Sequence, residues 1–208
     1  MLSTMKMTLI TLAAAFAAFV SPITAAEPEK GFVSLFDGKT LDGWKVNEKP
    51  EAFAVEDGAI RANGNRCHLF YVGKVNGAKF KNFELRMDVM TREHSNGGIF
   101  IHTTFLDAGW PSGYEIQVNN TQSDPQKSGG LYNTVPNPTP FADDTWMKYE
   151  ITVKDGTVIV KVNDKELVNH KPTADKTKLL PEGGTIAFQA HDPGSTTFYK
   201  NIRIKPLD

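Results

Sequence analysis

The chain has 208 residues, a formal net charge of −1 and a single cysteine, Cys67. The near-neutral charge argues against a nucleic-acid-binding protein, which needs a basic face. One cysteine excludes an internal disulfide and a cysteine-based zinc site. The length suits one domain of sandwich size rather than two.

Residues 1–26 have the pattern of a signal peptide. Lys6 supplies a weakly basic start, Leu9–Val20 is an apolar run, and Thr24-Ala25-Ala26 offers small residues for cleavage. The apolar run is short for a membrane span. We therefore expect cleavage near Ala26, export to the periplasm or the exterior, and no membrane association afterwards. The alternative is an N-terminal membrane anchor.

Residues 31–208 are predicted to form a single all-β domain. Short runs of β-branched and aromatic residues alternate with turn signals, and no sustained helical period is present. The predicted strands are Phe32–Phe36, Ala52–Val55, Ala59–Ala62, Phe83–Met90, Ile99–Thr104, Tyr114–Asn119, Gly129–Tyr132, Trp146–Lys154, Thr157–Val162, Thr185–His191 and Thr196–Lys205. About a dozen short strands indicate a β-sandwich. Pairing of the last strand with the first, common in jelly rolls, would cover both edges.

The connections carry clear turn chemistry. Glu56-Asp57-Gly58 and Asp155-Gly156 predict hairpins, because Gly tolerates positive φ, and Asn163-Asp164 predicts a third turn. The segment Asn133–Asp144 contains three prolines and is predicted to be a long loop. Loops of this kind on a rigid sheet often carry binding residues.

The stretch Gly97–Asn120 is expected to carry the functional face. Side chains alternate across a strand, so Glu115 and Gln117 would share one face of the strand Tyr114–Asn119. By the same alternation, His102 would share a face with Phe100 on the preceding strand. Two neighbouring strands would then present an acid, an amide and an imidazole on one polar sheet face, as sugar-binding β-sandwiches often do.

Two histidines are the candidates for proton transfer, because imidazole titrates near neutral pH. They are His102 and His191, which ends a strand on the same face as Gln189 and precedes the turn Asp192-Pro193-Gly194. The alternative for each is a hydrogen-bonded core histidine. His68 lies in a short apolar run and is predicted to be structural.

Glu115 is the candidate acid, because a charged group in a central strand is rarely buried without a partner. The alternative is an ion pair of Glu115 with Arg86 or Lys200. Trp110 and Tyr132 are the aromatic residues predicted to stack on sugar rings.

Several catalytic signatures are absent from the sequence. It has no Gly-rich phosphate loop, no Gly-x-Ser-x-Gly elbow and no His-Glu-x-x-His. It also lacks the Glu-x-Asp-x-x-Glu strand that carries paired carboxylates in laminarinase-like sandwiches. A glycosidase with two carboxylates therefore has little support.

An ordered set of short motifs nevertheless resembles a known family. The motifs are Leu35-Phe36-Asp37-Gly38-Lys39 with Leu41–Trp44, Phe83-Glu84-Leu85, Ser95–Phe100, Gly113–Val118, Gly129–Tyr132, Asp155-Gly156 with Val162-Asn163-Asp164, Ile186–His191 and Tyr199–Pro206. Together, over residues 31–207, they resemble the 3-keto-disaccharide hydrolase domain family. The resemblance implies a concanavalin A-like jelly roll that acts on sugars oxidised at C3 by a separate dehydrogenase. It also implies elimination of the C1 substituent and hydration of the resulting 2-hydroxy-glucal, a net hydrolysis.

The same resemblance implies a set of site residues. Glu115 and Gln117 match the family's Gly-Tyr-Glu-x-Gln strand, Gln189 and His191 match its Gln-x-His strand end, and Asn96 matches an Asn-Ser-Gly turn. Asn96, Gln117 and Gln189 are expected to bind substrate, with Tyr132, Trp110 and Lys200. Many members have Arg where this chain has His102 and Lys200.

The resulting hypothesis assigns His191 as the general base at C2, with Glu115 as an alternative base or orienting acid. A C3 ketone acidifies the C2 proton, so one base and one stabiliser of the enolate can replace a carboxylate pair. His102 and Lys200 would stabilise the enolate. No cofactor is certain, but a divalent ion held by His102, Glu115 and His191 is chemically reasonable.

Two other functions remain open. A non-catalytic carbohydrate-binding module would rely on the aromatic residues and bind unoxidised glycans, since fold does not fix function. A conventional glycoside hydrolase would need two carboxylates about 5–10 Å apart. The expected partner in every case is a carbohydrate.

Overall fold

The computed structural model describes residues 29–208, and the predicted signal peptide lies outside them. These residues form two antiparallel sheets. Sheet A has the order β13 (Lys165–His170), β12 (Thr157–Val162), β11 (Met147–Lys154), β6 (Phe83–Thr91), β15 (Thr197–Pro206), β4 (Ala59–Ala62) and β3 (Phe53–Glu56), and β1 (Val33–Ser34) also pairs with β15. Sheet B has the order β10 (Val135–Asn137), β9 (Lys127–Leu131), β8 (Tyr114–Asn119), β7 (Asn96–Thr103), β14 (Thr185–Ala190), β5 (Cys67–Tyr71) and β2 (Trp44–Val46).

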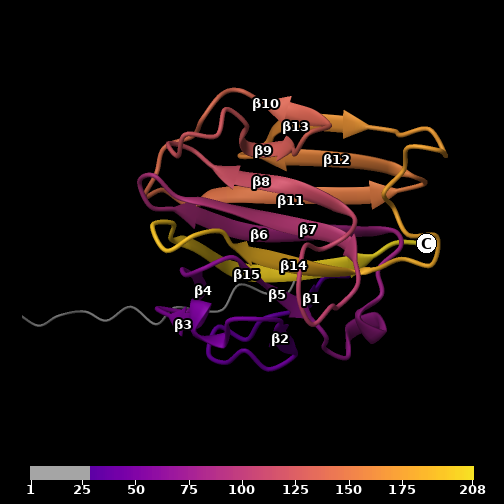
Figure 1. Ribbon diagram of the computed structural model, residues 1–208. Coiled ribbons are helices and arrows are strands. Elements are labelled where there is room, and N and C mark those ends of the chain that lie inside the picture. The colour runs from indigo at the N-terminus through magenta and orange to yellow at the C-terminus, as the bar shows by residue number, and fades with distance from the viewer. Residues whose placement is uncertain (1–28) are drawn as a thin grey trace, which may run out of the picture.

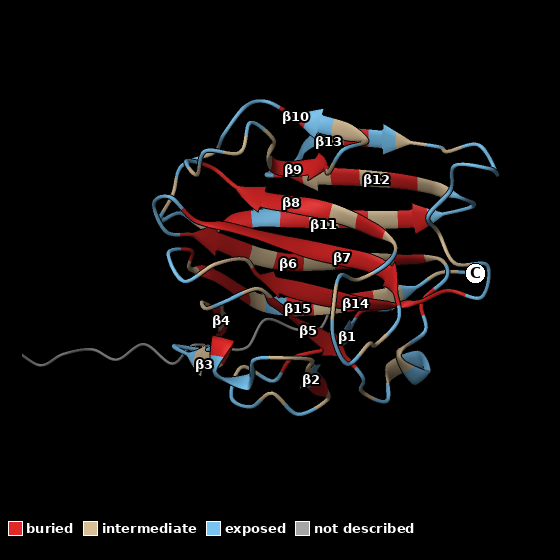
Figure 2. Ribbon diagram, viewed as in Figure 1, coloured by how far each residue is buried: buried red, intermediate tan, exposed pale blue. Residues whose placement is uncertain are grey.

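The two sheets stack as a sandwich, with β8, β7 and β14 lying over β11, β6 and β15 (Figure 1). The core lies between them, where Phe188 of β14 stacks on Tyr199 of β15 at a centroid distance of 4.3 Å. Trp44 stacks on the same Phe188 at 5.0 Å. The central strands of both sheets are mostly buried, whereas the connections are exposed (Figure 2). The predicted all-β jelly roll is confirmed.

The predicted hairpins form because their turn residues adopt positive φ. Asp57 and Gly58 join β3 to β4 with φ of 48° and 77°, and Asp155 and Gly156 join β11 to β12 with 49° and 78°. Asn163, at 50°, begins the turn between β12 and β13. Turns with two positive φ values match the right-handed twist of paired strands.

One prediction about strand pairing and one about a loop can be compared with the structure. The last strand does pair with the first, since Val33 lies opposite Ile204. The segment Asn133–Asp144 is not entirely a loop, because it contains the short strand β10 at the edge of sheet B. Pro136 is tolerated there because an edge strand leaves one side of its backbone unpaired.

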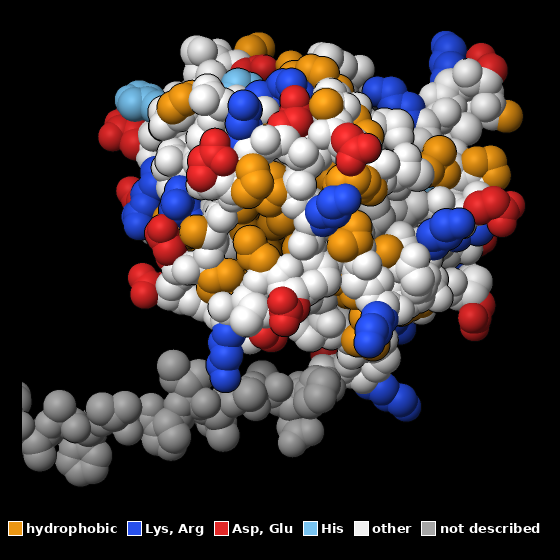
Figure 3. Space-filling model, turned by 60° about the horizontal axis from the view of Figure 1, so that its bottom comes forward, with side chains coloured by type: hydrophobic (Ala, Val, Ile, Leu, Met, Phe, Trp, Pro, Cys, Tyr) orange, Lys and Arg blue, Asp and Glu red, His pale blue; other side chains and the backbone are white. Residues whose placement is uncertain are grey.

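Only two short 3₁₀ segments, η1 (Pro50–Ala52) and η2 (Val75–Ala78), interrupt the strands of residues 29–208. Within this range no helix is long and apolar enough to cross a membrane. Acidic and basic side chains are interspersed on the face seen in Figure 3, around a more apolar central area.

Candidate active site

The outer face of sheet B brings most of the predicted site residues together. In its central strands every second side chain points into the core, as Ile99, Ile116 and Phe188 do. The outward-pointing residues are Gly98 and Phe100 of β7, Glu115 and Gln117 of β8, Gln189 of β14, and His68 and Phe70 of β5. The register places Gly98 opposite Gln117 and Gln189 opposite His68. We call Gly98, Glu115, Gln117, Gln189 and His68 the polar floor.

Glu115 lies over Gly98 on this floor. A Cβ atom added to Gly98 would lie 2.4 Å from Glu115 Oε1, so a larger residue there would force the carboxylate to move. Glu115 is half-buried and takes part in none of the ion pairs formed among residues 29–208. Burial, and secondarily the negative charge of Asp124, raise the pKa of Glu115 to about 7, although Lys178 opposes the shift. The carboxyl can therefore exchange a proton at neutral pH.

Asp124 is a site residue that sequence reasoning missed. It follows β8 in the loop 120–126, and its Oδ2 accepts a hydrogen bond of 3.3 Å from the Tyr132 hydroxyl. The Tyr132 amide in turn donates to the Glu115 carbonyl at 2.9 Å. Tyr132 therefore lies beside Glu115. Only the polar, turn-rich composition of Thr121–Ser128 marked this loop in the sequence.

His191 is held at the end of β14 by an acidic neighbour. Its Nδ1 lies 2.7 Å from Asp192 Oδ2, and Ser195 Oγ donates to the same oxygen at 2.8 Å. The backbone N–H of Gly194 donates to Asp192 Oδ1 at 2.8 Å. Burial acts to raise the pKa of Asp192, but the hydrogen bonds from His191, Ser195 and Gly194 lower it overall. Asp192 is therefore a carboxylate that orients the imidazole.

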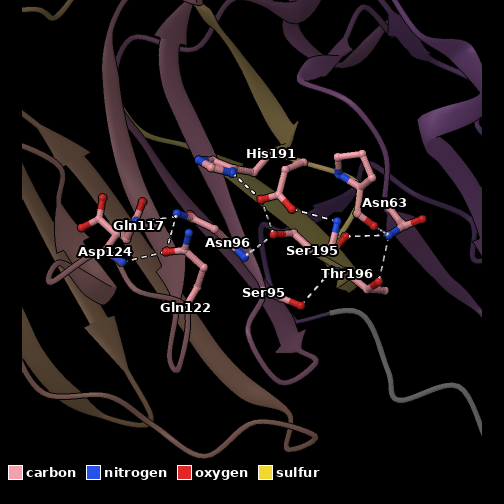
Figure 4. A network of polar contacts seen from close by, with 12 residues as sticks. Asn63, Ser95, Asn96, Gln117, Gln122, Asp124, His191, Ser195 and Thr196 are labelled. Carbon is pink, nitrogen blue, oxygen red and sulfur yellow. Dashed lines mark hydrogen bonds and ion pairs between the residues drawn. The ribbon is translucent and has the colours of Figure 1, made fainter.

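Asn96, expected to bind substrate, is 4% exposed. Its side chain lies between Gln117 and Gln122, with which it forms hydrogen bonds (Figure 4). Sequence reasoning missed Gln122.

His68 is the residue of the floor that lies beneath Trp110. Its imidazole is fully buried, its two ring nitrogens have no hydrogen-bond partner, and burial lowers its pKa to about 3, with the charge of Arg66 acting in the same direction. Trp110 covers it at a ring distance of 5.6 Å and remains 57% exposed. Arg66 lies over the Trp110 ring at 5.3 Å and donates to the Gly109 carbonyl at 3.1 Å. Trp110 thus stands next to the floor, between an imidazole and a guanidinium group.

The prediction that His102 shares this face is wrong. Between Thr185 and Ile186 the register with β7 shifts, so that His102 is an extra residue, a β-bulge, with φ of 53°. The bulge turns the ring toward Phe83, on which it stacks at 6.0 Å. Both ring nitrogens are engaged by backbone, with the Lys81 carbonyl at 2.9 Å and the Leu180 amide at 3.1 Å. His102 is the hydrogen-bonded core histidine of the alternative reading.

Lys200 is also away from the site. It lies opposite Asp88 in the backbone pairing of β15 with β6 in sheet A, and its ammonium group lies 3.8 Å from the centroid of the Trp146 ring. The metal ligand set of His102, Glu115 and His191 is therefore not assembled. No group of three His, Cys, Asp or Glu residues suited to a metal ion occurs within residues 29–208.

Fold and site together define a jelly roll with a polar floor on one outer face. The chain belongs to the family described as the 3-keto-alpha-glucoside-1,2-lyase-like domain, which its residues 31–205 match.

Known proteins of similar sequence and structure agree with this. In an alignment 233 positions long, the chain is 29% identical to a 3-keto-disaccharide hydrolase of Bacteroides thetaiotaomicron, with 86% of this chain and 79% of that protein covered. Its fold matches a crystal structure from Parabacteroides distasonis, assigned to the glycosyl hydrolases, with a TM-score of 0.66, 23% identity and coverage of 86% and 94%. It also matches the carbohydrate-binding module CBM66 of Bacillus subtilis with a TM-score of 0.54, 9% identity and coverage of 78% and 95%.

Proposed function

We propose that this protein cleaves 3-keto-glycosides by removing the C2 proton, eliminating the C1 substituent and hydrating the product. The observation that carries the proposal is Glu115, a half-buried carboxyl without an ion-pair partner among residues 29–208 and with a pKa of about 7. Such a group can donate and accept a proton at neutral pH, as acid–base chemistry requires. Family membership and the name of the Bacteroides relative support the same substrate class.

In the first step, His191 acts as the base. Its Nδ1 is occupied by Asp192 at 2.7 Å, so Nε2 is the nitrogen free to accept the C2 proton. The ketone at C3 acidifies this proton, and the electron pair moves into the enolate oxygen. Gln189 lies on the floor, is 2% exposed as a residue, and is the amide that we assign to that oxygen. An amide donor in a dry site stabilises developing negative charge.

In the second step, the enolate collapses to the ketone and forms a C1–C2 double bond. The bond from C1 to the leaving oxygen breaks, and protonated Glu115 gives that oxygen its proton. Water then adds to C1, with Glu115 taking a proton from it and His191 returning one to C2. The sum is hydrolysis without a net redox change, and the 3-keto group must come from a separate oxidation.

The experiment that tests the proposal follows two events separately. The protein lacking residues 1–26 is incubated in D₂O with 3-keto-trehalose and with a 3-keto-β-glucoside, and both exchange at C2 and release from C1 are measured. We expect His191→Gln to abolish both events, and Glu115→Gln to abolish release while exchange continues. Addition of a chelator tests for a metal requirement.

Three results would contradict the proposal. Binding of plain glycans without release from any 3-keto substrate indicates a carbohydrate-binding module. Cleavage of unoxidised glycosides that depends on Glu115 and Asp124 indicates a two-carboxylate hydrolase, which the effect of Asp124 on the pKa of Glu115 makes worth testing. If turnover survives both His191→Gln and Glu115→Gln, the polar floor is not the active site. We also propose export, which detection of a mature chain starting near Glu27 would support.

A further inference from the structure

Asn96 is the residue in which the two halves of the site meet. Its backbone N–H, its side-chain NH₂ and its side-chain carbonyl each form a hydrogen bond, to Ser195, Gln122 and Gln117 respectively. With both side-chain groups engaged and 4% exposure, Asn96 has little left to offer a substrate. We therefore look for its role in how it orients the side chains to which it is hydrogen-bonded (Figure 4).

The first set of contacts has a fixed direction because it begins at a backbone N–H, which can only donate. The Asp124 amide donates to Gln122 Oε1 at 2.7 Å, which identifies that atom as the oxygen. Asn96 Nδ2 donates to the same oxygen at 3.4 Å, so Asn96 Oδ1 faces Gln117 Nε2, at 3.3 Å. Gln117 Oε1 then remains as a buried acceptor without a donor.

The loop that starts this chain of contacts is itself held in place. The ammonium group of Lys127 donates to the carbonyls of Gln122 and Asp124 at 2.7 and 2.6 Å. These bonds hold the backbone N–H of Asp124 in place. They therefore also set the orientation of the side-chain amides of Gln122, Asn96 and Gln117, which follow it in this set of contacts.

The second set of contacts starts at the backbone N–H of Asn96. This group donates to Ser195 Oγ at 2.9 Å, which leaves the hydroxyl proton to be donated to Asp192 Oδ2 at 2.8 Å. A carboxylate only accepts, so His191 Nδ1 must carry a proton, and in the neutral imidazole Nε2 then presents a lone pair. Asn63 Nδ2 fixes the turn by donating to the carbonyls of Pro193 and Ser195 at 3.1 and 2.7 Å.

We propose that Asn96 is a positioning residue. Through the first set of contacts, which we call the amide relay, it orients Gln117 with its carbonyl oxygen free. Through the second set, the histidine relay, it orients His191 with an unprotonated Nε2 on the substrate side. This rests on the proposed function. Both relays end in an acceptor that no donor within residues 29–208 satisfies. The site therefore selects substrate groups that carry hydrogen: the C2–H at His191 and a sugar hydroxyl at Gln117. A substrate lacking that hydroxyl would leave Gln117 Oε1 unpaired, which is the costly case.

The histidine relay is tested by the tautomer of His191, read from side-chain ¹⁵N shifts in labelled protein and assigned with His191→Gln. We expect the Nδ1–H tautomer at neutral pH, and a change to Nε2–H in Asp192→Asn, with kcat at least 100-fold lower and KM within about twofold. Asp37→Asn is the matched control, because Asp37 also accepts backbone N–H bonds in an exposed turn. It should leave tautomer and kcat unchanged. An Nε2–H tautomer in the unmodified protein would overturn the proposal.

The amide relay is tested with a pair of substitutions at Gln122, whose Oε1 accepts both relay contacts. Gln122→Glu keeps an acceptor there, whereas Gln122→Met removes it. We expect Gln122→Glu to retain slowly exchanging side-chain NH₂ signals of Asn96 and Gln117, and Gln122→Met to lose them and raise KM about tenfold or more. Equal behaviour of the two variants would contradict the relay. The NMR outcomes do not depend on turnover. An inactive protein would therefore contradict the proposed function, while the NMR measurements would still test the two relays.

Discussion

The outer faces of the two sheets differ in how their charged groups are satisfied. On sheet A, Arg86 pairs with Glu29, with Glu84 at 3.5 Å and with Glu150 at 3.8 Å. Arg203 also reaches Glu29, at 3.3 Å. A hollow of about 810 Å³ lies on this side and is lined in part by these residues. Among its lining residues, Arg86 and Arg203 are paired with Glu29, and Arg86 also with Glu150.

The outer face of sheet B instead carries polar groups that lack partners. Glu115 has no ion pair among the described residues, Gln117 Oε1 lacks a donor, and neither ring nitrogen of His68 is bonded. Buried polar groups without partners lower stability. Natural proteins tend to retain such violations at functional sites. The comparison therefore locates the site by unsatisfied chemistry rather than by the size of a hollow.

The largest expected effect comes from neutralising one carboxylate on each face. Glu115→Gln should lower release of the leaving group by about 10²–10⁴-fold, because it removes the proton donor. Glu150→Gln on sheet A should leave turnover unchanged, since Glu150 faces Arg86 and not the floor. Steady-state kinetics on a 3-keto-glucoside checks both. A comparable loss of turnover in the two variants would contradict the assignment of the active site to the outer face of sheet B.

A smaller effect is expected from adding one methyl group to β7. In Gly98→Ala the new Cβ would displace the Glu115 carboxylate, from which it would be 2.4 Å away, so turnover should fall about 10²-fold. In Gly97→Ala the Cβ points inward, 3.1 Å from the Tyr199 hydroxyl, so stability should fall while kcat is kept. Kinetics and denaturant unfolding of both variants separate the two roles. Unchanged kcat in Gly98→Ala would contradict the placement of Glu115.

The raised pKa of Glu115 also predicts a pH dependence of stability. The folded protein binds this proton more tightly than the unfolded chain, so the free energy of unfolding should fall as pH rises from 4.5 to about 7. The loss should be at most about 3 kcal/mol, and Glu115→Gln should remove it. Denaturant unfolding between pH 4 and pH 8 measures the difference, with Glu150→Gln as the control. Parallel curves for the unmodified protein and Glu115→Gln would show that Glu115 ionises freely.

Much of the fold could be predicted because its signals are local. The bounds of β8 follow from alternation between Gly113 and Asn120, and the hairpins follow from Asp-Gly and Asn-Asp dipeptides. Alternation and residue chemistry singled out Glu115, Gln117 and His191, and the resemblance to the family matched them and Gln189 to its motifs. The structure places these residues on one face or at its end.

What sequence reasoning missed depends on long-range register. The bulge at His102 is defined by pairing with β14, more than 80 residues away, and nothing in the local sequence marks it. A second register shift, between Lys200 and Arg203, likewise cannot be read from alternation within β15. Asp124 reaches the site through a loop whose path periodicity cannot describe. Asp192 was interpreted only as part of a turn, although its position next to His191 was a usable signal.

The two buried histidines reverse the sequence-based expectation and provide the smallest predicted effect. His102, with both nitrogens bonded to backbone, should lose about 1–3 kcal/mol of stability in His102→Leu. His68, with neither nitrogen bonded, should gain about 1 kcal/mol in His68→Leu, because an unsatisfied buried group is removed. Denaturant unfolding of the two variants checks the signs. A stability loss in His68→Leu would mean that a water or a bound group satisfies this imidazole, and a rise in KM would then identify His68 as part of the sugar-binding surface.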